Sequence, residues 1–285
     1  MKSGTFPVDG ADLYYEVRGS GPALFIISGA GGDAGFFAAA ADELTDAFTV
    51  ITYDRRGNSR STGRKAEPMT FAQQASDARS LIDGLAGGRA IVFGNSAGGD
   101  IALALAAQHP DVIIGLIVHE PPTVSVLPER TALESFLDSI ETIFATDGGE
   151  VALTKFASTV RGEGSYEWPH DLTERVGDNV EHIFASEWTA ITRFTPDLAA
   201  LKRAPFPIAM TSGSASRGEY YARPSAVIAR EIGALWTEFP GLHLESLARP
   251  AVFAGALRAV ATLLFVKATG TIPEQWARTE APSQP

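Results

Sequence analysis

The stretch Ala90-Ile91-Val92-Phe93-Gly94-Asn95-Ser96-Ala97-Gly98-Gly99 decides the fold of this chain. Its four leading apolar residues predict a short buried strand of a parallel sheet. Residues 94–98 then match the pattern G-x-S-x-G, and residues 100–107 have strong helix-forming composition. A strand, a tight turn and a helix are the context that exposes a nucleophilic serine at the carboxyl end of a sheet.

Ser96 is therefore the predicted nucleophile. At the start of the following helix, the backbone N–H of Ala97 is expected to point toward the oxyanion that develops during acyl transfer. The alternative is a glycine-rich strand-to-helix turn that carries a serine by chance. The apolar run before the turn and the helix after it favour the nucleophile.

A second glycine-rich loop follows the apolar run 23–27 and reads Ser28-Gly29-Ala30-Gly31-Gly32-Asp33. It lacks the G-x-x-x-x-G-K-[ST] pattern of a phosphate-binding loop. In acyl-transfer enzymes, a loop at this place supplies the second backbone donor to the oxyanion. We expect that donor at Gly29 or Ala30, with a plain flexible turn as the alternative.

Length and composition limit the class of protein. The 285 residues, 45% of them hydrophobic and 20% charged, describe an ordinary globular chain with room for a large core. The absence of cysteine excludes disulfides and thiolate catalysis. Because residues 1–6 also lack the apolar core of a signal peptide, we expect a cytoplasmic protein.

Charge and hydropathy limit the partners. The net charge of −11 argues against nucleic acid and against anionic membranes. No stretch is expected to reach the ~20 apolar residues of a membrane span. The sequence leaves the oligomeric state open, a homodimer included.

The rhythm of apolar segments predicts an α/β fold in which helices flank a mostly parallel central sheet. Strands are predicted at 11–17, 23–27, 48–53, 90–93, 112–118, 207–212 and 234–239. Helices are predicted at 34–47, 70–85, 218–232 and 250–268. Charged residues at 54–56 are expected to pair and hold the loop after one of these strands.

The strand rhythm stops between residues 123 and 204, where segments 129–145, 148–160 and 171–192 favour helices. We predict a helical lid over this range, a core formed by 1–122 and 205–270, and a flexible tail at 271–285. The lid is rich in aromatic side chains, which are expected to form its own core and, in part, an apolar pocket. These are Phe136, Phe144, Phe156, Tyr166, Trp168, Phe184, Trp188 and Phe194.

His243 follows the last predicted strand directly. A lone histidine is more often structural than catalytic, but this position favours a general base. His119, His170 and His182 are predicted to be structural or exposed to solvent.

The order of these elements resembles the α/β-hydrolase fold with a cap inserted after strand six. The likeness rests on the loop 29–32, the turn 94–98 and His243 just past the final strand, with the serine before the histidine as in that family. It implies a triad of serine, histidine and an acid. The family's usual place for the acid reads Ser212-Gly213-Ser214-Ala215-Ser216 here and holds no aspartate.

Glu120, at the end of strand six, is the predicted acid instead. The zearalenone lactonases of this family are similar, because their acid is a glutamate after strand six within a His-Glu-Leu-Pro sequence, where this chain has His119-Glu120-Pro121-Pro122. Their lid contributes a tryptophan to the lactone pocket, which implies Trp188 here. Ser28 stands where those enzymes carry an aspartate. Ser28 is therefore a candidate substrate-binding residue, and the sequence does not identify the lactone. A dyad of Ser96 and His243 is the alternative.

The resemblance implies hydrolysis of an ester or lactone of a mainly apolar small molecule through an acyl-enzyme, with no metal or organic cofactor. Two alternatives remain. The same fold hosts lyases and cofactor-free oxygenases, and a non-catalytic binder of small molecules would keep the same scaffold.

Overall fold

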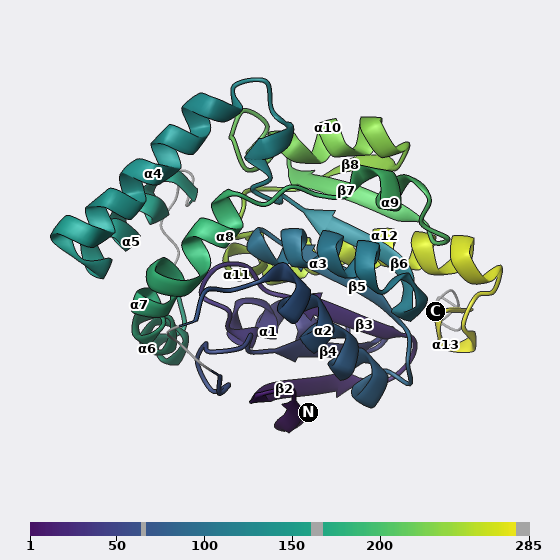
Figure 1. Ribbon diagram of the computed structural model, residues 1–285. Coiled ribbons are helices and arrows are strands. Elements are labelled where there is room, and N and C mark those ends of the chain that lie inside the picture. The colour runs from purple at the N-terminus through teal and green to yellow at the C-terminus, as the bar shows by residue number, and fades with distance from the viewer. Residues whose placement is uncertain (64–66, 161–167, 278–285) are drawn as a thin grey trace.

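The computed structural model describes residues 1–63, 67–160 and 168–277, and in them an eight-stranded sheet forms the centre of the molecule (Figure 1). The strands run in the order β1-β2-β4-β3-β5-β6-β7-β8, with β1 and β2 antiparallel to their neighbours and the others parallel. They are β1 (Lys2–Val8), β2 (Ala11–Gly19), β3 (Ala23–Ile27), β4 (Thr49–Tyr53), β5 (Ala90–Asn95), β6 (Ile113–His119), β7 (Ile208–Gly213) and β8 (Leu235–Phe239). The runs 23–27 and 90–93 are apolar throughout because these neighbouring strands are covered on both faces.

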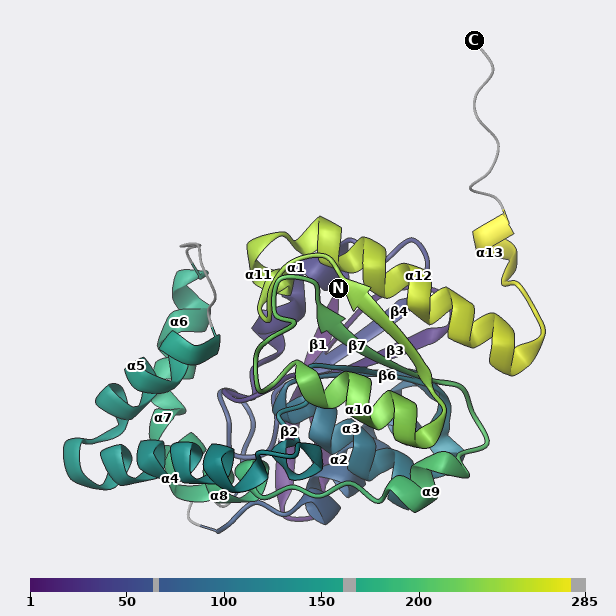
Figure 2. The ribbon, with the colours of Figure 1, turned by 90° about the horizontal axis from the view of Figure 1, so that it is seen from above.

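Helices cover both faces of this sheet, as Figure 2 shows. On one face lie α2 (Phe71–Leu85), α3 (Ala97–Gln108) and α10 (Arg223–Ile232), and on the other lie α1 (Ala38–Asp42), α11 (Glu245–Ala248) and α12 (Pro250–Thr269). Each face has its own apolar core. The predicted α/β class and its flanking helices are thus confirmed.

Several boundaries differ from the prediction. β1 was not expected, because none of its residues is buried: it is an edge strand, largely open to solvent, and lacks the apolar signal of a core strand. The predicted helix 34–47 is a 3₁₀ turn (Ala34–Phe37) followed by the short α1. The helix predicted from residue 218 begins only at Arg223.

The predicted flexible tail, 271–285, is in part a docked element. α13 (Glu274–Ala277) lies against the core, where Trp276 packs on Phe48 and Phe265. The indole Nε1 of Trp276 donates to the Ala47 carbonyl oxygen at 2.8 Å. Residues 278–285 lie outside the described residues.

α12 corrects the expectation that no stretch could span a membrane. An 18-residue window of this 20-residue helix has a mean hydropathy of 1.7, so the helix is long and apolar enough to cross a membrane by length and composition alone. It packs on the sheet through Phe253, Ala254, Leu257, Val260, Ala261 and Leu264, as the core helix of a globular domain does.

The segment between β6 and β7 is a helical cap (Figure 1). It contains α4 (Arg130–Asp147), α5 (Gly149–Val160), α6 (His170–Asp178), α7 (Val180–His182), a π-helical turn (Ile183–Glu187) and α8 (Trp188–Thr192). The last helix of the segment, α9 (Leu198–Lys202), packs on the core beside α3 and α10 instead, so the predicted lid boundary at residue 204 is too late. A separate apolar cluster holds α4, α5, α7 and α8 together. Of the aromatic residues expected in the lid, Tyr166 lies outside the described residues.

Candidate active site

Ser96 sits at a sharp turn between β5 and α3 with φ 56° and ψ −131°. Such a conformation costs a non-glycine residue on the order of 1–3 kcal/mol and persists only where the surroundings enforce it. Here they do so by close packing. A Cβ at Gly94 would lie 2.2 Å from the Gly98 carbonyl oxygen, and a Cβ at Gly98 would lie 2.2 Å from the Ile27 carbonyl oxygen. Both glycines of the G-x-S-x-G pattern are therefore required by the approach of strand, turn and helix.

The loop after β3 lies directly against this serine. A Cβ at Gly29 would be 2.7 Å from the Ser96 Cβ and 3.3 Å from its Oγ. The Gly32 N–H donates to the Gly29 carbonyl oxygen at 3.1 Å, which closes a turn that Gly31 completes with φ 90°. The expected oxyanion donors, Gly29 or Ala30 and Ala97, thus both lie next to Ser96.

His243 and Glu120 are hydrogen-bonded in the core beside Ser96. Glu120 is fully buried, and its Oε2 lies 2.6 Å from His243 Nδ1. Its Oε1 accepts from the backbone N–H of Gly213 at 2.7 Å. Gly213 ends β7, next to the position where the family usually carries its acid. In this chain the backbone N–H at that position instead binds a carboxylate that follows the neighbouring strand β6.

The charge state of Glu120 follows from these contacts. Burial alone raises its pKa, but the hydrogen bond from His243, the nearby histidines and the Gly213 N–H outweigh burial and lower the pKa to about 2. The carboxylate is therefore ionised at neutral pH and accepts the proton that His243 carries on Nδ1. This tautomer leaves the lone pair of Nε2 free to accept another proton.

Two cavities under the lid are lined by both Ser96 and His243. Gly29 and Ala30 line the first, and Ala30 and Ala97 line the second. The lid covers the first cavity with a set of apolar side chains, namely Leu153, Phe156, Val160, Trp168, Val176 and Ile183. Because the two cavities share wall residues, Ser96 and His243 among them, we treat them as one mainly apolar site over the serine.

Trp188 lies on the wall of the second cavity. It is also part of the lid core, because its Nε1 donates to the Leu137 carbonyl oxygen at 3.2 Å and its ring packs edge-on against Phe156. Ser28 is placed differently. It is buried behind the loop and is not among the residues that line either cavity.

Sequence reasoning missed Tyr221, whose ring centroid lies 4.5 Å from that of His243. It lies outside any regular pattern, so no sequence signal could have singled it out. His119, predicted to be structural, is buried between Phe93 and Phe239, and its Nδ1 lies 2.9 Å from Thr211 Oγ1. Burial lowers the pKa of His119 to about 4, so it is neutral at pH 7. Glu219 is exposed.

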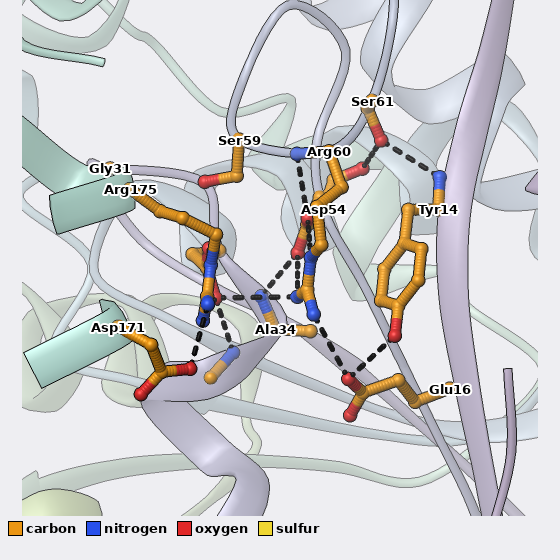
Figure 3. A network of polar contacts seen from close by, with 12 residues as sticks. Tyr14, Glu16, Gly31, Ala34, Asp54, Ser59, Arg60, Ser61, Asp171 and Arg175 are labelled. Carbon is orange, nitrogen blue, oxygen red and sulfur yellow. Dashed lines mark hydrogen bonds and ion pairs between the residues drawn. The ribbon is translucent and has the colours of Figure 1, made fainter. Parts of the chain in front are cut away.

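The charged residues after β4 hold the loops next to the site, as expected (Figure 3). Arg60 binds Asp54 through Nε at 2.6 Å and reaches Glu16 at 3.2 Å. From the lid, Arg175 of α6 binds the buried Asp33 through Nε at 2.6 Å. Figure 3 shows Arg60 and Arg175 approaching the loop after β3 from two sides.

Comparisons with known proteins identify chains that this one resembles. Residues 22–205 match the model of the alpha/beta hydrolase fold family. The chain is 34% identical over 250 residues to the "Uncharacterized hydrolase YraK" of Bacillus subtilis, covering 85% of this chain and 90% of that one. It is also 42% identical over 123 residues to the "Putative carbamate hydrolase RutD" of Caulobacter sp. (strain K31). That match covers 41% of this chain and 44% of RutD.

The fold recurs among solved structures. An esterase from Thermogutta terrifontis superimposes with a TM-score of 0.75 at 18% identity, covering 93% of this chain and 100% of the esterase. At that identity the likeness concerns the fold alone.

Proposed function

Because this chain belongs to the α/β hydrolase fold family and is a hydrolase, we propose that it cleaves an ester or lactone of a mainly apolar small molecule through an acyl-enzyme on Ser96. One observation carries the proposal. The strained Ser96 shares its cavity with His243, whose Nδ1 is bonded to the buried carboxylate of Glu120.

In the proposed reaction, Ser96 Oγ attacks the substrate carbonyl while His243 Nε2 takes its proton. The backbone N–H groups of Ala97 and of Gly29 or Ala30 stabilise the oxyanion. The alcohol leaves with the proton from Nε2, and His243 then activates water to release the acid. Glu120 stays ionised throughout and stabilises the imidazolium that forms twice in each cycle.

The lining of the site supports an apolar acyl or alcohol group. Trp168, Phe156 and Val160 from the lid and Phe36 from the core line the first cavity, and Trp188 lies on the second. A zearalenone-type macrolactone is one substrate of this kind, supported by the resemblance around Glu120. The name of RutD adds carbamates, which react by the same acyl chemistry.

A substrate panel with a covalent probe tests the proposal. Aryl esters, macrocyclic lactones and carbamates are offered to the wild type and to Ser96→Ala, and both are treated with a fluorophosphonate. We expect labelling at Ser96 in the intact mass, turnover of at least one panel member, and neither in the variant. A labelled residue other than Ser96 would contradict the proposal, and an unlabelled protein would favour a lyase or a non-catalytic binder.

A further inference from the structure

Arg55 and Glu187 form an ion pair between the core and the lid that has no exposed surface. Arg55 lies in the loop after β4, and Glu187 ends the π-helical turn of the lid. Arg55 Nη1 and Nη2 each lie 2.7 Å from a carboxylate oxygen of Glu187, and both side chains are 0% exposed. A buried pair of this kind adds little to stability compared with apolar side chains, so its presence calls for another reason.

The guanidinium of Arg55 has a further acceptor in the oxyanion loop. Its Nη2 also donates to the Gly29 carbonyl oxygen at 3.1 Å, the oxygen that the Gly32 N–H binds from within the turn. In a trans peptide, the carbonyl and the next N–H point in opposite directions. Holding the Gly29 carbonyl toward Arg55, which lines neither cavity, therefore points the Ala30 N–H away from Arg55, and Ala30 lines both cavities together with Ser96.

Glu187 in turn fixes the direction of the guanidinium. Its two oxygens bind the two terminal nitrogens of Arg55 in parallel, a geometry that restricts rotation of the fork. The amide Nδ2 of Asn58 donates to Glu187 Oε1 at 2.9 Å and holds the carboxylate itself. The position of the Gly29 carbonyl thus depends on a side chain that belongs to the lid.

We propose that the Arg55–Glu187 pair is a positioning device for the oxyanion hole, through which the docked lid orients the Gly29–Ala30 peptide. The inference rests on the proposed acyl-enzyme reaction of Ser96. Neither residue touches the substrate, since both act through the Gly29 carbonyl. Losing the pair should weaken binding of the tetrahedral state while leaving ground-state binding by the apolar walls intact.

The double variant Arg55→Met/Glu187→Leu tests this, because it removes both charges together and leaves none unpaired. With a p-nitrophenyl ester, we expect kcat to fall about tenfold to a hundredfold, below the effect of deleting an oxyanion donor outright. KM should stay within about twofold. The inhibition constant of an alkyl boronic acid, which forms a tetrahedral adduct on serine, should rise by the same factor as kcat falls.

Arg193→Gln is the matched control. Arg193 pairs with Asp138 inside the lid and is partly exposed, so its loss removes a lid charge without touching the loop after β3. We expect kcat, KM and the boronate constant to be unchanged. If the Arg55–Glu187 pair merely held the lid in place, the double variant would change KM and kcat together. The inhibition constant of the boronic acid would then not rise by the factor by which kcat falls.

The outcomes separate the inference from the function on which it rests. Wild-type kcat and boronate affinity in a folded double variant would overturn the inference alone, whereas a wild type that a fluorophosphonate does not label at Ser96 would overturn the proposed function and the inference with it. If the double variant does not fold, a crystal structure of the wild type phosphonylated at Ser96 decides. A phosphonyl oxygen bonded to Ala30 N, with Arg55 still on Gly29, supports the inference, and an Arg55 turned away from Gly29 contradicts it.

Discussion

Glu120 occupies a backbone conformation that few residues tolerate, with φ 48° at the first position after β6. Its N–H donates to the Thr211 carbonyl oxygen at 3.0 Å, which extends the pairing of β6 with β7 by one residue. This turn brings the carboxylate between the Gly213 N–H and His243 Nδ1. The extra methylene of glutamate, compared with aspartate, suits an approach from strand six.

Replacing Glu120 by Gln keeps the shape of the side chain but removes the charge that stabilises the imidazolium. We expect turnover of the best substrate to fall on the order of 10⁴-fold with the fold intact. Steady-state kinetics measure the effect, and circular dichroism checks the fold. Glu219→Gln is the control, since Glu219 is exposed, and should change turnover little. Near wild-type turnover in Glu120→Gln would leave Ser96 and His243 as a dyad.

Asp100 is another fully buried carboxyl, in the first turn of α3. Thr123 Oγ1 donates to its Oδ1 at 2.5 Å, and its Oδ2 has no hydrogen-bond partner among the described residues. Burial raises the pKa of Asp100 well above its ordinary value, against a smaller lowering by the Thr123 hydrogen bond. The folded protein therefore holds this proton over a pH range in which the unfolded chain has lost it.

The sign of the resulting pH dependence is fixed by that difference. As pH rises above the unfolded pKa of about 4, the unfolded state gains from ionising Asp100 and the folded state loses stability at up to roughly 1.4 kcal/mol per pH unit. Asp100→Asn should remove this component. Urea unfolding from pH 4 to 8 measures it, and parallel pH profiles for variant and wild type would contradict it.

At the scale of elements, the turn between β5 and α3 is defined by how closely α3 approaches β3. Gly98 faces the Ile27 carbonyl oxygen so closely that no side chain fits there. The approach places the start of α3, and with it the Ala97 N–H, beside the reacting serine. Close packing of the α3 backbone on the β3 backbone thus helps set the geometry of the nucleophile.

Gly98→Ala should therefore be severely destabilising, because a backbone carbonyl 2.2 Å from the new Cβ cannot rotate away. We expect a loss of about 3 kcal/mol or more in the free energy of unfolding, or no folded protein. Gly255→Ala in α12 is the matched control, since its Cβ meets nothing within 4 Å. It should stabilise the helix by about 0.5–1 kcal/mol. Equal unfolding midpoints for the two variants would contradict this account.

At the scale of the whole molecule, the lid is tied to the core through the loops after β3 and β4. Arg175 binds Asp33, Asn179 Nδ2 donates to the Gly31 carbonyl oxygen at 2.8 Å, and Glu187 binds Arg55. These ties all lie within a short stretch of α6 to α8, and they meet the loops that border Ser96. Docking of the lid and the shape of the site are therefore linked.

Arg175→Ala removes one of these ties and leaves the buried Asp33 without its lid partner. We expect the lid to open more often, so that limited proteolysis cuts within residues 123–204 faster while the core fragments persist. KM should rise several-fold because the lid forms one wall of the site. Arg130→Ala, which removes an exposed pair with Glu134 in α4, is the control. Equal cutting rates in both variants would contradict the link between this tie and lid docking.

The sequence by itself determined what depends on local pattern. The apolar runs 23–27 and 90–93 identified central strands because such strands are covered on both faces, and the spacing of residues 94–98 identified the turn that holds Ser96. The break in strand rhythm after residue 122 identified the cap. The strand and turn signals each lie within a few consecutive residues, where side-chain periodicity and backbone chemistry act together, and the cap follows from the absence of such strand signals over residues 123–204.

Only the tertiary structure decided what depends on residues far apart in the chain. The contact of Tyr221 with His243 and the Arg55–Glu187 pair on Gly29 join segments far apart in the chain. So does the bond between Glu120 and His243, which the sequence predicted but left open against a dyad. The buried position of Ser28 and the docking of Trp276 likewise follow from neighbours that no periodicity announces. Their physical reason is packing at the carboxyl edge of the sheet, where the strand order β4-β3-β5-β6-β7-β8, and not the chain order, sets which side chains meet.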